Sequence, residues 1–251
     1  MKTESVMIIL ILLGILFTSG CTNEQTLESD GNKIIMSFSE HLASIRDYSG
    51  TVLQKTYDQD PVLEQYRIHV RYPDNYKVEY IESSNCNAGV ISILDANEFL
   101  EYDPVNSQTI QAQVNPEGNS VTSRDYLGLL NRILPEGNIR YAGVEYLENQ
   151  PAYVIEVQPE KPGDFSNLKY SEFRFSLVKV WVDPKTGFVK KVELYDSNGT
   201  RLIVSADFQE LFVNSGFPDD VFSKEYYLQY SLITAPTHPP IVKYPGVEYP
   251  E

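Results

Sequence analysis

Cysteine and histidine are scarce in this sequence, and the common catalytic signatures are missing. Two cysteines and three histidines occur among 251 residues. Two cysteines cannot form a framework of several disulfides. His41, His69 and His238 lack the close spacing that holds a metal ion, and no GxSxG, glycine-rich phosphate loop or CxxC occurs. We therefore expect no metal, no cofactor and no enzymatic activity.

Positive charge is also in short supply. The chain has 20 Lys and Arg residues against 35 Asp and Glu residues, which gives a formal net charge of −15. So acidic a surface is repelled by a phosphate backbone and by a broad anionic lipid surface. We expect no nucleic-acid partner.

The sequence has one long apolar run, and it lies at the N-terminus. Val6 to Phe17 follows a short segment containing Lys2 and precedes the small residues before Cys21. A basic start, an apolar stretch and a small-residue exit are typical of an export signal. The run is shorter than the roughly 20 residues that usually span a bilayer. We interpret residues 1–20 as a signal peptide, with an uncleaved signal anchor as the alternative.

The residues Thr18-Ser19-Gly20-Cys21 resemble the lipobox of bacterial lipoproteins, although Thr18 stands where that motif usually has an aliphatic residue. The resemblance implies that Cys21 is the lipid attachment site and becomes the first residue after cleavage. We therefore expect an extracytoplasmic protein, lipid-anchored to the outer face of the cell membrane, with residues 21–31 as a lipidated tether. Cys86 then remains alone, as an incidental thiol or, alternatively, a reactive one.

Most of the mature chain, residues 32–230, has the alternation of a β protein. Apolar and polar residues alternate in several runs separated by turn sequences, which is typical of antiparallel strands with one wet face. We count about ten or eleven strands, too many for one flat sheet, so the sheet should curl. His69 alternates with Arg67 and Arg71 and is expected on a solvated face. Residues 231–251 are rich in proline and are interpreted as an extended arm.

Two segments have helical periodicity instead. Residues 33–46 and residues 122–134 each place apolar side chains on one stripe, and the second segment stops at Pro135. We therefore predict a mainly β (α+β) fold, an open antiparallel β-half-barrel covered by about two amphipathic helices. The residues on the two stripes are Ile34, Phe38, Leu42 and Ile45, and Tyr126, Leu127, Leu130, Ile133 and Leu134.

The 18 tyrosines and 11 phenylalanines lie largely in the predicted strands. They either fill the core or line an apolar pocket, and both interpretations fit aromatic side chains. The sequence Asn198-Gly199-Thr200 has two interpretations as well. It is a hairpin turn, and it is also a sequon in which Asn198 would be glycosylated.

Three segments of the sequence match motifs of a known superfamily. The central match is a strand, an Asp-Pro-x-Thr-Gly turn and a second strand ending in Asp-x-x-Gly. The other two matches correspond to an opening helix with its first strand and to a closing segment. In chain order the three segments read FSEHLASIRDYSGT (38–51), VKVWVDPKTGFVKKVELYDSNG (178–199) and FPDDVF (217–222). They resemble the LolA-like superfamily, which includes the periplasmic lipoprotein carrier, its receptor and the sensor domain of RseB-like proteins.

The resemblance implies a half-barrel with an apolar cavity that accepts acyl chains. Our first hypothesis is a membrane-anchored protein that binds a lipid, an acyl chain or a lipoprotein without catalysis. In the alternative, the half-barrel is dry and acts as an envelope sensor or a scaffold for another envelope protein, through its acidic surface or its arm. In the first hypothesis the residues expected to form the lid and the cavity lining are Phe38, Leu42, Leu127, Leu130 and Trp181.

Overall fold

The computed structural model describes residues 23–57, 61–84, 88–113, 124–160, 175–229 and 231–234. Four sequence predictions therefore lie outside the described residues: the signal peptide, the lipid attachment at Cys21, the thiol at Cys86 and nearly all of the proline-rich arm. Within the described residues, no helix is both long and apolar enough to cross a membrane.

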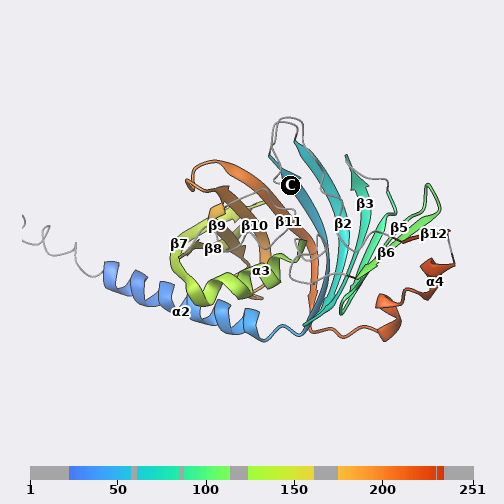
Figure 1. The fold of residues 1–251 in the computed structure, drawn as a ribbon. Coiled ribbons are helices and arrows are strands. Elements are labelled where there is room, and N and C mark those ends of the chain that lie inside the picture. Colours follow the sequence, from blue (N-terminus) through green and yellow to red (C-terminus); the bar gives the residue numbers. More distant parts are fainter. Residues whose placement is uncertain are drawn as a thin grey trace, which may run out of the picture.

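One curled sheet of twelve strands forms the body of the described protein (Figure 1). The sheet order is β12-β6-β5-β4-β3-β2-β1-β11-β10-β9-β8-β7. Every neighbouring pair is antiparallel except β12 and β6, which are parallel. The strands are β1 (Asp47–Thr56), β2 (Val62–Arg71), β3 (Asn75–Ser83), β4 (Ile91–Asp95), β5 (Glu98–Asp103), β6 (Gln108–Gln113), β7 (Gly137–Leu147), β8 (Gln150–Pro159), β9 (Phe175–Val182), β10 (Val189–Asp196), β11 (Leu202–Val213) and β12 (Ser231–Thr234).

Period-two alternation places the apolar side chains on the concave face. In β2, for example, Tyr66, Ile68 and Val70 are fully buried whereas Arg67 is exposed. Two helices, α2 (Asn23–Ala43) and α3 (Tyr126–Ile133), cover part of this face (Figure 1). The predicted fold class, an open antiparallel half-barrel with helices, is confirmed. Strand β12 was not predicted, because it falls in the segment interpreted as an arm.

Both helices differ from their predicted bounds. Helix α2 begins at Asn23 instead of residue 33, so the polar segment interpreted as a tether is helical from Asn23 on. The residues of this tether segment form no apolar stripe, but several of them are good helix formers. Helix α3 is capped by Asp125, whose carboxylate accepts a hydrogen bond from the Gly128 N–H at 2.7 Å. A short 3₁₀ turn, η3 (Leu134–Glu136), contains Pro135 and ends the helical segment.

The convex face is covered where we expected water. The C-terminal segment, with η5 (Asp219–Phe222) and α4 (Glu225–Leu228), lies across β2 to β6. Arg71 lies over the rings of Phe217 and Phe222, 5.4 Å from each centroid. His69 meets Phe217 edge-on and is half-buried, so the prediction of a solvated His69 is wrong. Burial and the neighbouring Lys77 and Arg67 lower the pKa of His69.

The packing of α3 against the sheet yields a stability prediction. Leu130 is fully buried in the main core, whereas Met36 on α2 is 59% exposed. Leu130→Ala should lower the free energy of unfolding by about 2–5 kcal/mol, because it removes buried methyl groups and leaves a cavity. Met36→Ala should change it by less than about 0.5 kcal/mol. Urea unfolding of both variants checks this, and equal losses would contradict the placement of α3.

Candidate functional site

The four helical residues expected to form a lid lie together. Phe38 and Leu42 from α2 and Leu127 and Leu130 from α3 are all buried, and all belong to the main core cluster. Their side chains pack against the concave face and close it where the helices cross it. The helices therefore cover that part of the face with their own core side chains.

Trp181 lies elsewhere, and its expected place in the cavity needs correction. Its neighbours in β9, Val180 and Val182, face the concave side, and alternation turns Trp181 to the other face. There it packs with Ala152 and Val154 in a separate small cluster. Its indole N–H donates to Glu145 at 2.9 Å, and the ammonium of Lys191 lies 5.1 Å from the ring centroid. Sequence alternation indicated that the faces differ, but it did not indicate which one is concave.

A buried carboxylate ties α3 to the sheet. Besides capping α3, Asp125 accepts hydrogen bonds from the hydroxyl of Tyr48 at 2.8 Å and of Tyr72 at 3.0 Å. Burial raises the pKa of Asp125, although the Gly128 N–H and the two hydroxyls oppose this. Burial and Asp125 in turn raise the pKa of Tyr48. This network fixes the helix and is structural.

A second buried polar group lies on the same face. The side-chain oxygen of Gln54 accepts hydrogen bonds from Tyr126 at 2.8 Å and from Tyr66 at 3.1 Å. Glu64 accepts from Gln54 at 3.3 Å and pairs with Arg124 at 3.2 Å. These side chains bind one another, so together they form a polar network that holds the start of α3 against the sheet.

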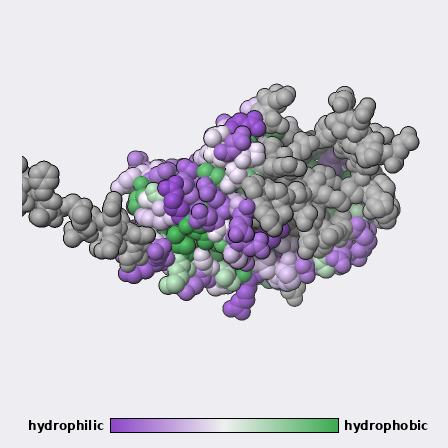
Figure 2. All heavy atoms as spheres, turned by 60° about the vertical axis from the view of Figure 1, so that its left-hand side comes forward, coloured by the Kyte–Doolittle hydropathy of each residue, from purple (hydrophilic) through white to green (hydrophobic). Residues whose placement is uncertain are grey.

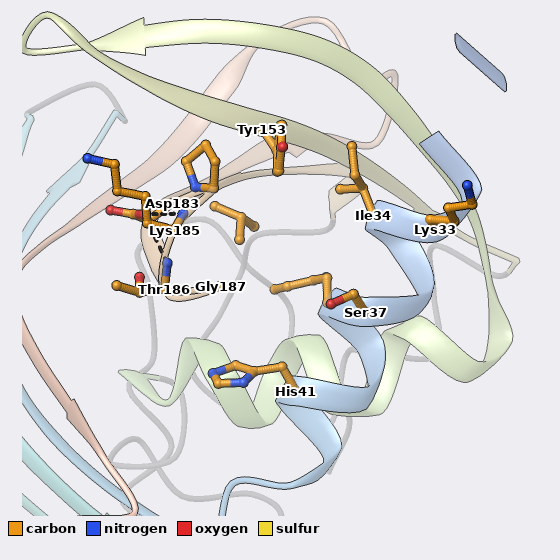
Figure 3. Close-up of a pocket in the computed structure, with 12 residues that line it drawn as sticks. Lys33, Ile34, Ser37, His41, Tyr153, Asp183, Lys185, Thr186 and Gly187 are labelled. Atoms are coloured by element: carbon orange, nitrogen blue, oxygen red, sulfur yellow. Dashed lines mark hydrogen bonds between the residues drawn. The ribbon is translucent and has the colours of Figure 1, made fainter. Parts of the chain in front are cut away.

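An open groove runs between α2 and the end of the sheet, and we call it the α2 groove (Figure 3). It has a volume of about 340 Å³, within the range of roughly 300–1,000 Å³ found for small-molecule sites. In Figure 3, Lys33 lies at one end and the turn after β9 at the other, with Ser37 and His41 projecting from α2. The lining residues are Lys33, Ile34, Ser37, Phe38, His41, Tyr153, Val182, Asp183, Pro184, Lys185, Thr186 and Gly187.

The apolar side chains of the α2 groove come from both of its walls. Ile34 and Phe38 are supplied by α2, and Tyr153 and Val182 by β8 and β9. The space-filling view agrees, since hydrophobic surface shows between hydrophilic side chains on the side of the molecule that carries α2 (Figure 2). An apolar interior with a polar rim suits an apolar chain with a polar end.

The far end of the groove is built by the Asp-Pro-x-Thr-Gly turn. One carboxylate oxygen of Asp183 accepts hydrogen bonds from the N–H groups of Lys185 at 2.7 Å and Thr186 at 3.1 Å. Gly187 closes the turn with φ of 72°, a conformation that favours glycine. Burial raises the pKa of Asp183, but the two N–H groups and Lys190 outweigh it, so the pKa lies below its usual value. The motif was visible in the sequence. The sequence did not show that this turn lies next to α2, which is far away along the chain.

Serine, histidine and aspartate side chains all line the groove, but they do not form a catalytic triad. Such a triad needs hydrogen bonds from serine to histidine and from histidine to aspartate. Asp183 is instead engaged by its own turn and lies 3.6 Å from Lys190. Among the described residues, no hydrogen bond joins Ser37, His41 and Asp183, and no cluster of ligands could hold a metal ion.

A larger hollow of about 600 Å³ lies near the turn between β7 and β8. Its lining is mostly polar or charged and includes Glu148, Gln150, Asp207 and Gln209. Polar groups make up a larger share of its lining than of the lining of the α2 groove, so the α2 groove is the better candidate for an apolar ligand.

Asn198 is exposed, in the turn between β10 and β11. The carboxylate of Asp196 accepts hydrogen bonds from the N–H groups of Asn198, Thr200 and Arg201. Gly199 has φ of 68°, as this turn requires. The turn chemistry explains the sequence, and glycosylation of Asn198 remains a prediction.

The buried Asp125 yields a pH prediction. Its folded pKa is raised above the ordinary 3.8, so its stabilising effect is full below that value and is lost as pH rises through the folded pKa. Asp125→Asn keeps an N-cap side chain but does not titrate. The stability of the unchanged protein relative to Asp125→Asn should therefore fall as the pH rises above about 4. Urea unfolding at a series of pH values from about 4 upward measures it, and a rising difference would contradict the raised pKa.

Comparisons with known proteins find likeness in structure only. No family model matches the sequence, and no curated protein matches it. A LolA superfamily protein from Nitrosomonas europaea is similar with 15% identity and a TM-score of 0.37, over 78% of this chain and 98% of that one. The lipoprotein LppX from Mycobacterium tuberculosis has 12% identity and a TM-score of 0.48, over 74% and 98%. The MucA/MucB complex of Pseudomonas aeruginosa is similar with 13% identity and a TM-score of 0.45, over 82% of this chain and 64% of that one. One of these proteins, the one from Nitrosomonas europaea, is described as a member of the superfamily that the sequence motifs resemble.

Proposed function

We propose that this protein binds the acyl chain of a lipid or lipoprotein in the α2 groove, without catalysis. The observation that carries the proposal is an open groove of about 340 Å³ whose Ile34, Phe38, Tyr153 and Val182 offer apolar surface beneath a polar rim. The driving force would be removal of the chain from water, about 0.8 kcal/mol for each methylene buried. The proposal rests on this geometry and not on the distant likenesses in structure.

The N-terminus supports an extracytoplasmic place for this binding. The signal-like run and the lipobox-like Cys21 favour a protein held to the outer face of the cell membrane by a lipid. Helix α2 begins two residues after that cysteine. If Cys21 carries the lipid, the helix that forms one wall of the groove continues almost directly from the anchor.

The groove can be tested by blocking it. Ser37 and Glu40 are both exposed on α2, but only Ser37 lines the groove. Ser37→Trp should abolish saturable binding of a fluorescent fatty acid, because the indole occupies the mouth. Glu40→Trp should leave binding unchanged and serves as the matched control. If both variants bind like the unchanged protein, the chain does not lie in the α2 groove.

Chain length supplies an independent test. Each methylene that enters the groove should strengthen binding about fourfold, the equivalent of about 0.8 kcal/mol, until the groove is full. A series of saturated fatty acids of increasing length, titrated by calorimetry, measures this gradient. Affinity that does not depend on chain length would contradict burial of the chain.

A second candidate function is favoured by the closed part of the core. Leu42, Leu127 and Leu130 fill the concave face beneath the helices with the protein's own side chains, as a dry sensor or scaffold would require. In that case a partner protein would bind the acidic surface or the proline-rich arm. Deletion of residues 235–251 should then remove a partner that the full chain retains in a pull-down from envelope extracts. An unchanged set of partners would argue against the arm as a binding segment.

A further inference from the structure

The α2 groove differs in charge from the rest of the molecule. The whole chain carries a formal charge of −15, yet the groove is lined by two lysines and a single acidic residue. That acidic residue, Asp183, is already engaged by the N–H groups of its turn and by Lys190. The groove therefore presents a local excess of positive charge within an acidic protein.

The polar groups that remain uncommitted at the groove are donors and a cation. Lys33 pairs with Asp30 at 3.6 Å, and the lysine that pairs with Asp183, also at 3.6 Å, is Lys190 and not Lys185. The hydroxyl of Thr186 accepts from the N–H of Phe188 at 3.3 Å and keeps its own hydrogen to donate. These groups suit an anion better than a cation or a neutral end group.

The size of the groove limits the apolar part of the ligand. Its volume of about 340 Å³ is near the lower end of the roughly 300–1,000 Å³ found for small-molecule sites. A groove at this end of the range suits a single alkyl chain. The apolar residues lie along α2 and β8, and the uncommitted polar groups lie at the turn after β9 (Figure 3).

Resting on the proposed function, we propose that the ligand of the α2 groove is an anionic single-chain amphiphile. Its carboxylate or phosphate end contacts Lys185 and the Thr186 hydroxyl, and its chain lies against Ile34, Phe38 and Tyr153. The shared chemistry is a compact anion on one alkyl chain, as in a free fatty acid or an alkyl phosphate.

The experiment compares four probes that share one chain and differ in the end group: decanoate, decyl phosphate, decanol and decyltrimethylammonium. Each carries a photoreactive diazirine in its chain and is used below its micelle concentration. The full chain is held in nanodiscs, and peptide mass spectrometry maps the cross-links. The yield at groove peptides as a function of probe concentration gives an apparent affinity for this site, with Ser37→Trp as the background.

The expected result is that the anions bind about tenfold more tightly than decanol and that the ammonium probe binds weakest. Lys185→Ala should reduce the affinity for the anions roughly two- to fivefold, as expected for an exposed ion pair, and leave decanol unchanged. Lys185→Arg should restore it, and Lys55→Ala, which removes an exposed lysine outside the groove, should have no effect. The two anionic probes distinguish a carboxylate ligand from a phosphate ligand.

Three outcomes would contradict all or part of the inference, and they are distinguishable. Equal cross-linking of all four probes at the groove would reject the anionic end group while leaving acyl-chain binding intact. No cross-linking of any probe at the groove would reject the proposed function and the inference with it. A preference for anions that survives Lys185→Ala unchanged would assign the charge recognition to other residues and contradict the proposed role of Lys185.

Discussion

The antiparallel pairing of β1 with β11 is the interaction on which the rest of the structure depends. It joins the strands β2 to β6 to the strands β7 to β10 in one sheet, with Tyr48 opposite Val213 and Thr56 opposite Val204. Gly50 lies at this junction, where a Cβ atom would meet the carbonyl oxygen of Glu210 at 2.5 Å. Because the two groups of strands are joined here, their apolar faces form a single concave surface.

That concave surface needs a cover, and the two helices supply it in different ways. Helix α3 is held tightly, since Asp125 caps it and also accepts hydrogen bonds from the hydroxyls of Tyr48 and Tyr72. Helix α2 buries Phe38 and Leu42 in the same core but leaves a groove along its other side. The difference separates a rigid, closed part of the face from a part that is open to a ligand.

The groove is made by segments with separate structural reasons for their shape. The turn after β9 is shaped by hydrogen bonds of Asp183 and by the positive φ of Gly187. The helical wall belongs to α2, a continuous helix of 21 residues. Neither segment has to adjust to form the groove, so the site is largely preformed, and preformed sites cost less ordering on binding.

The sequence by itself determined the local structure and the fold class. Alternation specified the strands, the stripe from Ile34 to Ile45 specified a helix, and Asp183-Pro-Lys-Thr-Gly187 specified a tight turn, because each depends on neighbours in the chain. Only the tertiary structure decided which face of the sheet is concave, and this places Trp181 outside the cavity. The tertiary structure also decided which polar strand faces are covered, and for this reason His69 is half-buried under Phe217. It also brought Ser37 and His41 to the turn at Lys185, since strand pairing over long sequence separations has no local signal. Burial and charge at the groove therefore follow from the fold, whereas the residues that supply them were already present as ordinary turn and helix positions.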